Sequence, residues 1–169
     1  YLEIATPGSA NPTFGFEQRA QQPVIETAAG FYANGVIVHI SAADGAEIHY
    51  TTDCSTPTRT SPLYTGPISI SATTVIRAIA CAPDQLCSAV AGATYFINDS
   101  SPVPVVSLYT DNTYLFDDST GVMVKGTGRT PNYMKNLQYP CQLEYFDENG
   151  QLGICQMGTF KIAGKTMRT

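Results

Sequence analysis

The side chains best suited to binding a ligand in this chain are tyrosines outside the predicted strands. Tyr133 and Tyr139 lie in a polar loop, where an aromatic ring could stack on the C–H face of a sugar. Tyr50 and Tyr64 lie in or near predicted strands, where a position in the core is the better interpretation. We therefore take Tyr133 and Tyr139 as the candidate carbohydrate-binding residues.

The densest group of acidic residues could in principle hold calcium. Asp111, Asp117 and Asp118 supply carboxylates, and carboxylates with loop carbonyls suit this hard cation. Their spacing does not match an EF-hand loop, and aspartates commonly form turns in solvent. We therefore expect turn-forming carboxylates here, with no metal and no cofactor.

The residue types used in catalysis are present but not arranged in a known motif. Glu47, Asp53 and Glu144 could serve glycoside hydrolysis only if two of them met across a substrate, and no motif brings them together. His39 and His49 lie on separate predicted strands, and no G-x-S-x-G nucleophile elbow occurs. We expect surface side chains at these positions and no enzymatic activity.

The five cysteines give two candidate disulfides. Cys81 and Cys87 flank the turn APDQL, and Cys141 and Cys155 flank the turn DENG, so each pair could bridge locally. Buried free thiols are the equally supported alternative, and the odd number leaves at least one thiol, such as Cys54, unpaired within the chain. No CxxC spacing occurs, which disfavours zinc.

The composition points to an all-β protein. Only 14% of the 169 residues are charged, and Val, Ile, Thr, Ser, Gly, Pro and Tyr are prominent, as is typical of short strands and tight turns. The net charge of −5 and the scattered basic residues disfavour nucleic-acid binding. No apolar run is long enough to predict a membrane span.

Turn signals and composition breaks divide the chain into four parts. We expect an extended arm over residues 1–22, a β-sandwich over 23–98, a linker over 99–102 and a smaller β unit over 103–169. Turns at short regular intervals favour a sandwich over an α/β fold. Asn34-Gly35 is a hairpin-type turn signal, and Asp44-Gly45 is a second tight-turn signal. The strands expected in the sandwich lie at Val24–Glu26, Val36–Ile40, Ile48–Thr52, Ile68–Ile70, Val75–Ala80 and Thr94–Ile97.

The second half predicts fewer elements. Strands are expected at Val105–Leu108 and Val122–Lys125, with a short helix or irregular turn over Asn112–Asp118. Cys141–Phe146 and Ile154–Ile162 should form a hairpin across the turn DENG. We expect the interface between the two units to bury apolar strand faces and fix their relative angle.

The sandwich region carries a family resemblance. The motifs Y-T-T-D-x-S-x-P-T, Y-x-G-P-I-x-I and T-T-V-I-R-A resemble the C-terminal domain of chitobiases and β-hexosaminidases. This module is similar to a fibronectin type III or immunoglobulin-like sandwich, and it recurs in secreted bacterial multidomain proteins. The family usually has Gly where this chain has Cys54. The resemblance implies a non-catalytic accessory role.

Two further resemblances concern the neighbouring segments. The motifs P-V-V-S-L, L-F-D-D-S-T-G-V-M-V-K-G and G-T-F-K-I-A-G-K-T-M-R resemble the lead-in of CotH (spore coat protein H) kinase-like proteins, in which a segment near Gly164 and Arg168 ends the lead-in. The string A-T-P-G-S-A-N resembles the end of a lamin-tail domain. Together they imply a spacer in an extracellular or cell-surface bacterial protein, whose partners are its neighbouring domains and which positions a downstream kinase-like domain. Carbohydrate binding through tyrosines is the alternative.

Overall fold

The structure, a computed structural model, describes residues 18–163 and confirms the all-β fold. Most of the predicted arm, the lamin-tail-like string and the segment from Gly164 to Arg168 therefore lie outside the described residues. Within them, the helical elements are α1 (Asn112–Phe116) and the 3-10 turn Asn132–Met134. None of these helices has the length and apolar character that crossing a membrane requires.

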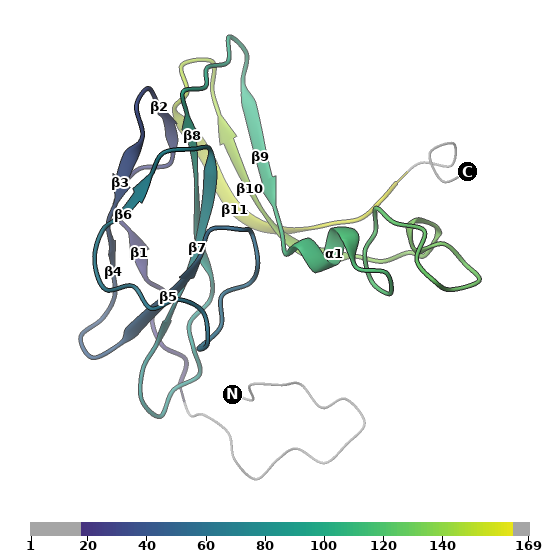
Figure 1. The fold of residues 1–169 in the computed structure, drawn as a ribbon, viewed down its shortest axis with the longest axis horizontal. Helices are drawn as coiled ribbons and strands as arrows, with labels where there is room; N and C mark the ends of the chain where they lie inside the picture. The colour runs from purple at the N-terminus through teal and green to yellow at the C-terminus, as the bar shows by residue number, and fades with distance from the viewer. Residues whose placement is uncertain (1–17, 164–169) are drawn as a thin grey trace.

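The first eight strands build the predicted sandwich (Figure 1). One layer is a four-stranded sheet in the order β2-β8-β7-β5, and the other consists of the two-stranded sheets β1-β4 and β3-β6. The strands are β1 (Val24–Ile25), β2 (Gly30–Tyr32), β3 (Val36–Val38), β4 (Ile40–Ser41), β5 (Glu47–Thr51), β6 (Ile68–Ile70), β7 (Thr74–Cys81) and β8 (Ala91–Ile97).

The sandwich core lies between these layers and comes from alternate strand residues. On β7, Ile76 and Ala78 are fully buried, and on β8 Tyr95 is fully buried. Period-2 alternation sends every second side chain of a strand to the same face, so each long strand contributes a row of core residues. The full cluster is Val38, Ile40, Ile48, Ile70, Ile76, Ala78, Ala93, Tyr95 and Ile97.

A three-stranded sheet forms a further layer on the four-stranded sheet. It consists of β9 (Val105–Tyr109), β10 (Tyr139–Phe146) and β11 (Leu152–Phe160) in the order β11-β10-β9, and Figure 1 shows it beside β8. The β8 side chains that do not enter the sandwich core face this sheet, and Thr94 donates its backbone N–H to Glu144 on β10. Strand β8 is therefore covered on both faces. Between β9 and β10, the chain through α1 extends away from the strands.

Two predictions about local structure are corrected. Val122–Lys125 is not a strand: the backbone N–H groups of Val122 and Met123 donate to carbonyls of Tyr114 and Leu115, so the segment folds back on α1. The turn at Asn34-Gly35 connects strands of different sheets, so it closes no hairpin. The tight turn predicted at Asp44-Gly45 is present, with the backbone N–H of Ala46 donating to the Ala43 carbonyl.

Strand β2 was not predicted. It is three residues long and pairs in parallel with β8. Parallel neighbours are distant in the sequence, and a run this short carries no periodic signal. The predicted hairpin of β10 and β11 is present, with pairing from Tyr139↔Phe160 to Phe146↔Leu152.

Candidate functional site

The two candidate sugar-binding tyrosines lie in different surroundings. Tyr139 stacks on Tyr114 with ring centroids 4.4 Å apart and an interplanar angle of 5°, and Phe160 packs against it at a tilt. Its hydroxyl donates to the Thr120 carbonyl over 2.9 Å. One ring face is thus already occupied by protein. Tyr133 is half-buried in the 3-10 turn and forms no such stack among the described residues.

The cysteines divide into one bridge and three thiols. Cys81, at the end of β7, forms a disulfide with Cys87. Cys54, Cys141 and Cys155 are free, so a Cys141–Cys155 bridge is corrected. The reason is the strand register: Cys155 pairs with Glu144 and Cys141 pairs with Gly158, which puts the two thiols on opposite faces of the sheet.

The acidic candidates form turns and caps. Asp117 accepts hydrogen bonds from Ser119 and Thr120, and these bonds lower its pKa to about 2. Asp111 is the N-cap of α1 and accepts from the backbone N–H of Thr113. No group of three potential metal ligands occurs within residues 18–163. The arrangement is that expected for turn-forming carboxylates.

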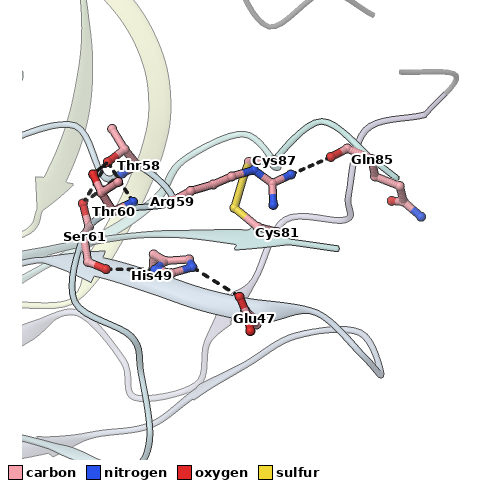
Figure 2. A network of polar contacts seen from close by, with 9 residues as sticks. All are labelled: Glu47, His49, Thr58, Arg59, Thr60, Ser61, Cys81, Gln85 and Cys87. Carbon is pink, nitrogen blue, oxygen red and sulfur yellow. Dashed lines mark hydrogen bonds and ion pairs between the residues drawn. A yellow bond between two sulfur atoms is a disulfide. The ribbon is translucent and has the colours of Figure 1, made fainter. Parts of the chain in front are cut away.

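The two histidines differ in exposure. His39 is exposed as predicted, whereas His49 on β5 is only 7% exposed, which corrects the expectation of a surface histidine. Its Nδ1 lies 2.9 Å from the Ser61 carbonyl oxygen, and its Nε2 lies 3.7 Å from the exposed Glu47 carboxylate (Figure 2). The carbonyl can only accept, so Nδ1 carries a proton. This geometry holds the loop after β5 against the sheet and brings no nucleophile to the ring.

The same loop is tied to the disulfide-closed turn. Arg59 donates from its guanidinium to the Gln85 carbonyl over 2.8 Å, beside the Cys81–Cys87 bridge in Figure 2. Within the loop, the Ser61 hydroxyl accepts from the backbone N–H of Thr58. This polar network fixes a long turn-rich loop in place, which is a structural role.

The most extensively built polar and aromatic arrangement lies between the sandwich and the β9–β11 sheet. Three phenylalanines meet there: the Phe31 and Phe96 rings stack at 4.5 Å, and the fully buried Phe146 ring meets both edge-on. Such edge-to-face aromatic contacts add specific geometry to the burial of apolar area. The cluster joins β2, β8 and β10 into one packed unit.

Beside the phenylalanines lies a buried carboxyl group. Glu144 is 1% exposed, which corrects the expectation of a surface carboxylate at this position. It accepts from the Thr94 backbone N–H at 3.1 Å and from the Tyr109 hydroxyl at 3.4 Å. Burial raises the pKa of Glu144, and these hydrogen bonds offset the effect only in part. Tyr109 in turn lies against Gly92, where a Cβ atom would stand 2.5 Å from its hydroxyl. Any side chain at position 92 would therefore displace the Tyr109 ring from this place.

A second polar contact joins the two regions at the loop that follows β5. The Asp111 carboxylate accepts from the backbone N–H of Thr56, and the Asn112 amide donates to the Asp53 carbonyl. Burial alone would raise the pKa of Asp111, but hydrogen bonds from Thr113 and Thr56 outweigh it and lower the pKa to about 2. Cys54, within this loop, has a left-handed backbone with φ of 65°.

Comparison with known families identifies part of the sandwich. Residues 27–92 match the family model of the chitobiase/beta-hexosaminidase C-terminal domain. The matched segment begins before β2 and ends at the second residue of β8, so the resemblance seen in the sequence motifs is confirmed for this region. The Tyr50 and Tyr64 rings of those motifs meet edge-on at 6.5 Å and pack against the core, as expected. No curated protein matches the chain.

Sequence reasoning did not predict the residues that join the two regions. Phe31, Thr94 and Glu144 lie on three different strands, and nothing in their spacing indicates that they meet. One signal was available: Glu144 interrupts the apolar residues of a predicted strand, and a carboxyl group at such a position is either exposed or specifically partnered.

Proposed function

We propose that this chain is a non-catalytic accessory region of a larger secreted or surface-attached bacterial protein. It acts as a rigid connector that sets the orientation of its C-terminal sheet relative to the sandwich. The observation that carries the proposal is the shared interface, in which Phe146 is fully buried against Phe31 and Phe96 and Glu144 is hydrogen-bonded to β8. A flexible tether would not need a buried carboxyl group with matched donors.

Rigidity can be tested by backbone ¹⁵N relaxation. A connector predicts one rotational correlation time for amides of β5, β7 and β8 and for those of β9–β11, because the layers tumble together. Shorter effective correlation times confined to β9–β11 would contradict the proposal, since the sheet would then move independently of the sandwich.

A more specific part of the proposal concerns the domain whose orientation this region would set. The motifs of the second half resemble the lead-in of CotH kinase-like proteins, so the neighbour we propose is a kinase-like domain following this region. Calorimetry with ATP and Mg²⁺ or Mn²⁺ tests this on the 169-residue chain and on a protein extended past Thr169. We expect binding by the extended protein alone. Binding by the 169-residue chain itself would contradict the accessory role.

Carbohydrate binding is the second candidate, and the name of the matched family supports it. Tyr133 is the better-placed tyrosine, because the Tyr139 ring is stacked on Tyr114. A glycan screen should then give a ligand whose affinity falls in Tyr133→Ala and changes less in Tyr139→Ala. A screen without any ligand, or equal binding by both variants and the parent chain, would exclude this site.

A further inference from the structure

A cleft lies between strand β11 and the part of the sandwich formed by β1, the segment after it and the start of β8. It has a volume of about 380 Å³, and its walls carry Ile25, Ala28, Ala93 and Leu152. A second cleft of about 450 Å³ adjoins it and shares Ala28, Ala29 and Leu152. Together they form one groove along the inner side of β11 with mostly apolar walls.

The floor of this groove offers hydrogen-bond acceptors. Glu144 and Gln142 line it, and both are more than nine-tenths buried. The Gln142 amide nitrogen donates to the Gly92 carbonyl and to the Cys155 sulfur, which fixes the orientation of the amide. The Gln142 Oε1 atom accepts no hydrogen bond from any residue between 18 and 163. A buried acceptor without a donor is costly, so this floor favours a ligand that donates.

The charges at the groove are one-sided. Among the described residues that line it, Glu144 alone carries a carboxyl group, and none is a lysine or an arginine. The donors that Glu144 does have, from Thr94, Tyr109 and the Cys155 thiol, are uncharged. A cationic donor would therefore meet a buried carboxyl group that no protein cation neutralises.

The groove also lies along an open sheet edge. Strand β11 pairs with β10 and, within the described residues, with no other strand. Its nine residues, LGICQMGTF, include no charged residue and no proline, the devices that usually protect an edge from pairing. Cys155 pairs with Glu144 and Met157 with Gln142, so these β11 side chains lie on the same face of the sheet as the groove floor, and Cys155 lines the groove.

We propose that the groove binds the side chain of a lysine presented by an extended peptide strand that pairs with the free edge of β11. The backbone of such a strand would form hydrogen bonds with the unpaired N–H and C=O groups of the β11 edge, as in other cases of β-strand addition. Its lysine would run beneath β11 along the apolar walls, and the ammonium group would reach Glu144 and the free Gln142 oxygen. Two strand spacings of about 4.8 Å separate the added strand from β10. The long lysine stem and the Glu144 side chain together span that distance.

The test uses the whole chain, labelled with ¹⁵N, and a synthetic peptide as long as β11 that alternates Thr and Val around one central Lys. We expect the peptide to shift the amide signals of β11 and of Thr94, whose N–H contacts Glu144. Replacing the peptide lysine by norleucine removes only the ammonium group, and it should weaken binding by about tenfold or more. Both peptides are compared on the unmodified protein, and equal binding of the two would overturn the proposal.

Protein variants distinguish binding in the cleft from a general attraction between the peptide and the negatively charged protein. Glu144→Gln keeps the shape of the side chain, and it should weaken the lysine peptide to the level of the norleucine peptide. Glu148→Gln is the matched control, because Glu148 is exposed on the hairpin that leads into β11 and should leave affinity unchanged. Similar losses in both variants would overturn the proposal. Shifts of Thr94 with free butylamine, but none with the peptide, would overturn strand addition.

Discussion

Strands β7 and β11 are the longest of their respective regions, and they are buried very differently. In β7, the last six of eight residues are buried, because the sandwich core covers one face and other protein segments cover the opposite face. In β11, the first eight of nine residues are exposed, and Leu152, Ile154 and Met157 are each more than two-fifths exposed. The sandwich therefore has its own core, whereas the C-terminal sheet takes much of its buried surface from the sandwich.

This difference in burial indicates which region depends on the other for its stability. Tyr95, Ile76 and Val38 are fully buried among sandwich residues, so the sandwich should fold without the sheet. The largest fully buried side chain of the sheet, Phe146, packs against Phe31 and Phe96 of the sandwich. Loss of this contact should unfold the sheet while the sandwich stays folded. The sheet should not stay folded when the sandwich unfolds.

The largest effect is expected from Phe146→Ala compared with Ile76→Ala. Truncating a buried Phe costs about 3–5 kcal/mol, and truncating a buried Ile costs about 2–5 kcal/mol. In hydrogen exchange, Phe146→Ala should lose protection in β9–β11 and keep it in β5 and β7, whereas Ile76→Ala should lose it in both regions. Equal loss across the chain in Phe146→Ala would show that the two regions unfold as one unit.

A smaller effect is expected from removing the Cys81–Cys87 disulfide. The bridge closes a short loop, and such a cross-link contributes about 2 kcal/mol in the chain-entropy description. The variant with both Cys81→Ala and Cys87→Ala should lower the free energy of unfolding of the sandwich, measured by denaturant titration. Cys155→Ala is the matched control, because this exposed thiol forms no bridge. A reducing agent should destabilise the parent chain and leave the double variant unchanged.

The contact between the loop after β5 and α1 predicts a pH dependence. The pKa of Asp111 is about 2 in the fold, below its ordinary value of 3.8, so its ionised form favours folding. That contribution is complete above pH 3.8 and is lost as the pH falls towards 2. Asp111→Asn should remove this part of the acid dependence, with an effect below about 1 kcal/mol because solvent screens the half-buried carboxylate in part.

Amide exchange at Thr56 reports the same contact locally. Its N–H donates to the Asp111 carboxylate, so its protection should fall in Asp111→Asn while that of β7 stays unchanged. If Thr56 exchanged equally in both proteins, the contact would not hold the two regions together.

The sandwich was predictable from sequence to a greater extent than the sheet and its interface. Most sandwich strands have β-branched residues in alternation, and the tyrosine and turn motifs fall at regular intervals, so local signals agreed with the final fold. Val122–Lys125 looked like a strand because it is apolar, yet Val122 is buried against the α1 region instead. The partnering of Glu144 with Thr94, 50 residues earlier, depends on how the sheets stack, and no local pattern encodes that.

The smallest expected effect concerns Cys54, a position at which the family that this region resembles usually has glycine. Its φ of 65° places a side chain in the left-handed region, which costs a non-glycine residue about 1–2 kcal/mol. Cys54→Gly relieves that cost but adds freedom to the unfolded chain, worth about 0.4–1 kcal/mol in the opposite direction. We therefore expect a net gain of about 0.5 kcal/mol, measured by denaturant titration.

The control for this position is Cys54→Ala, which removes the thiol and keeps the strained backbone. The Cys54 carbonyl accepts from Arg77, and the neighbouring Asp53 carbonyl accepts from Asn112, so the backbone here is held from both regions. If those contacts fix the left-handed conformation, Gly should be more stable than Ala at position 54. Equal stability of the two variants would mean that the loop relaxes when the side chain changes, and that it joins the regions less firmly than the aromatic interface does.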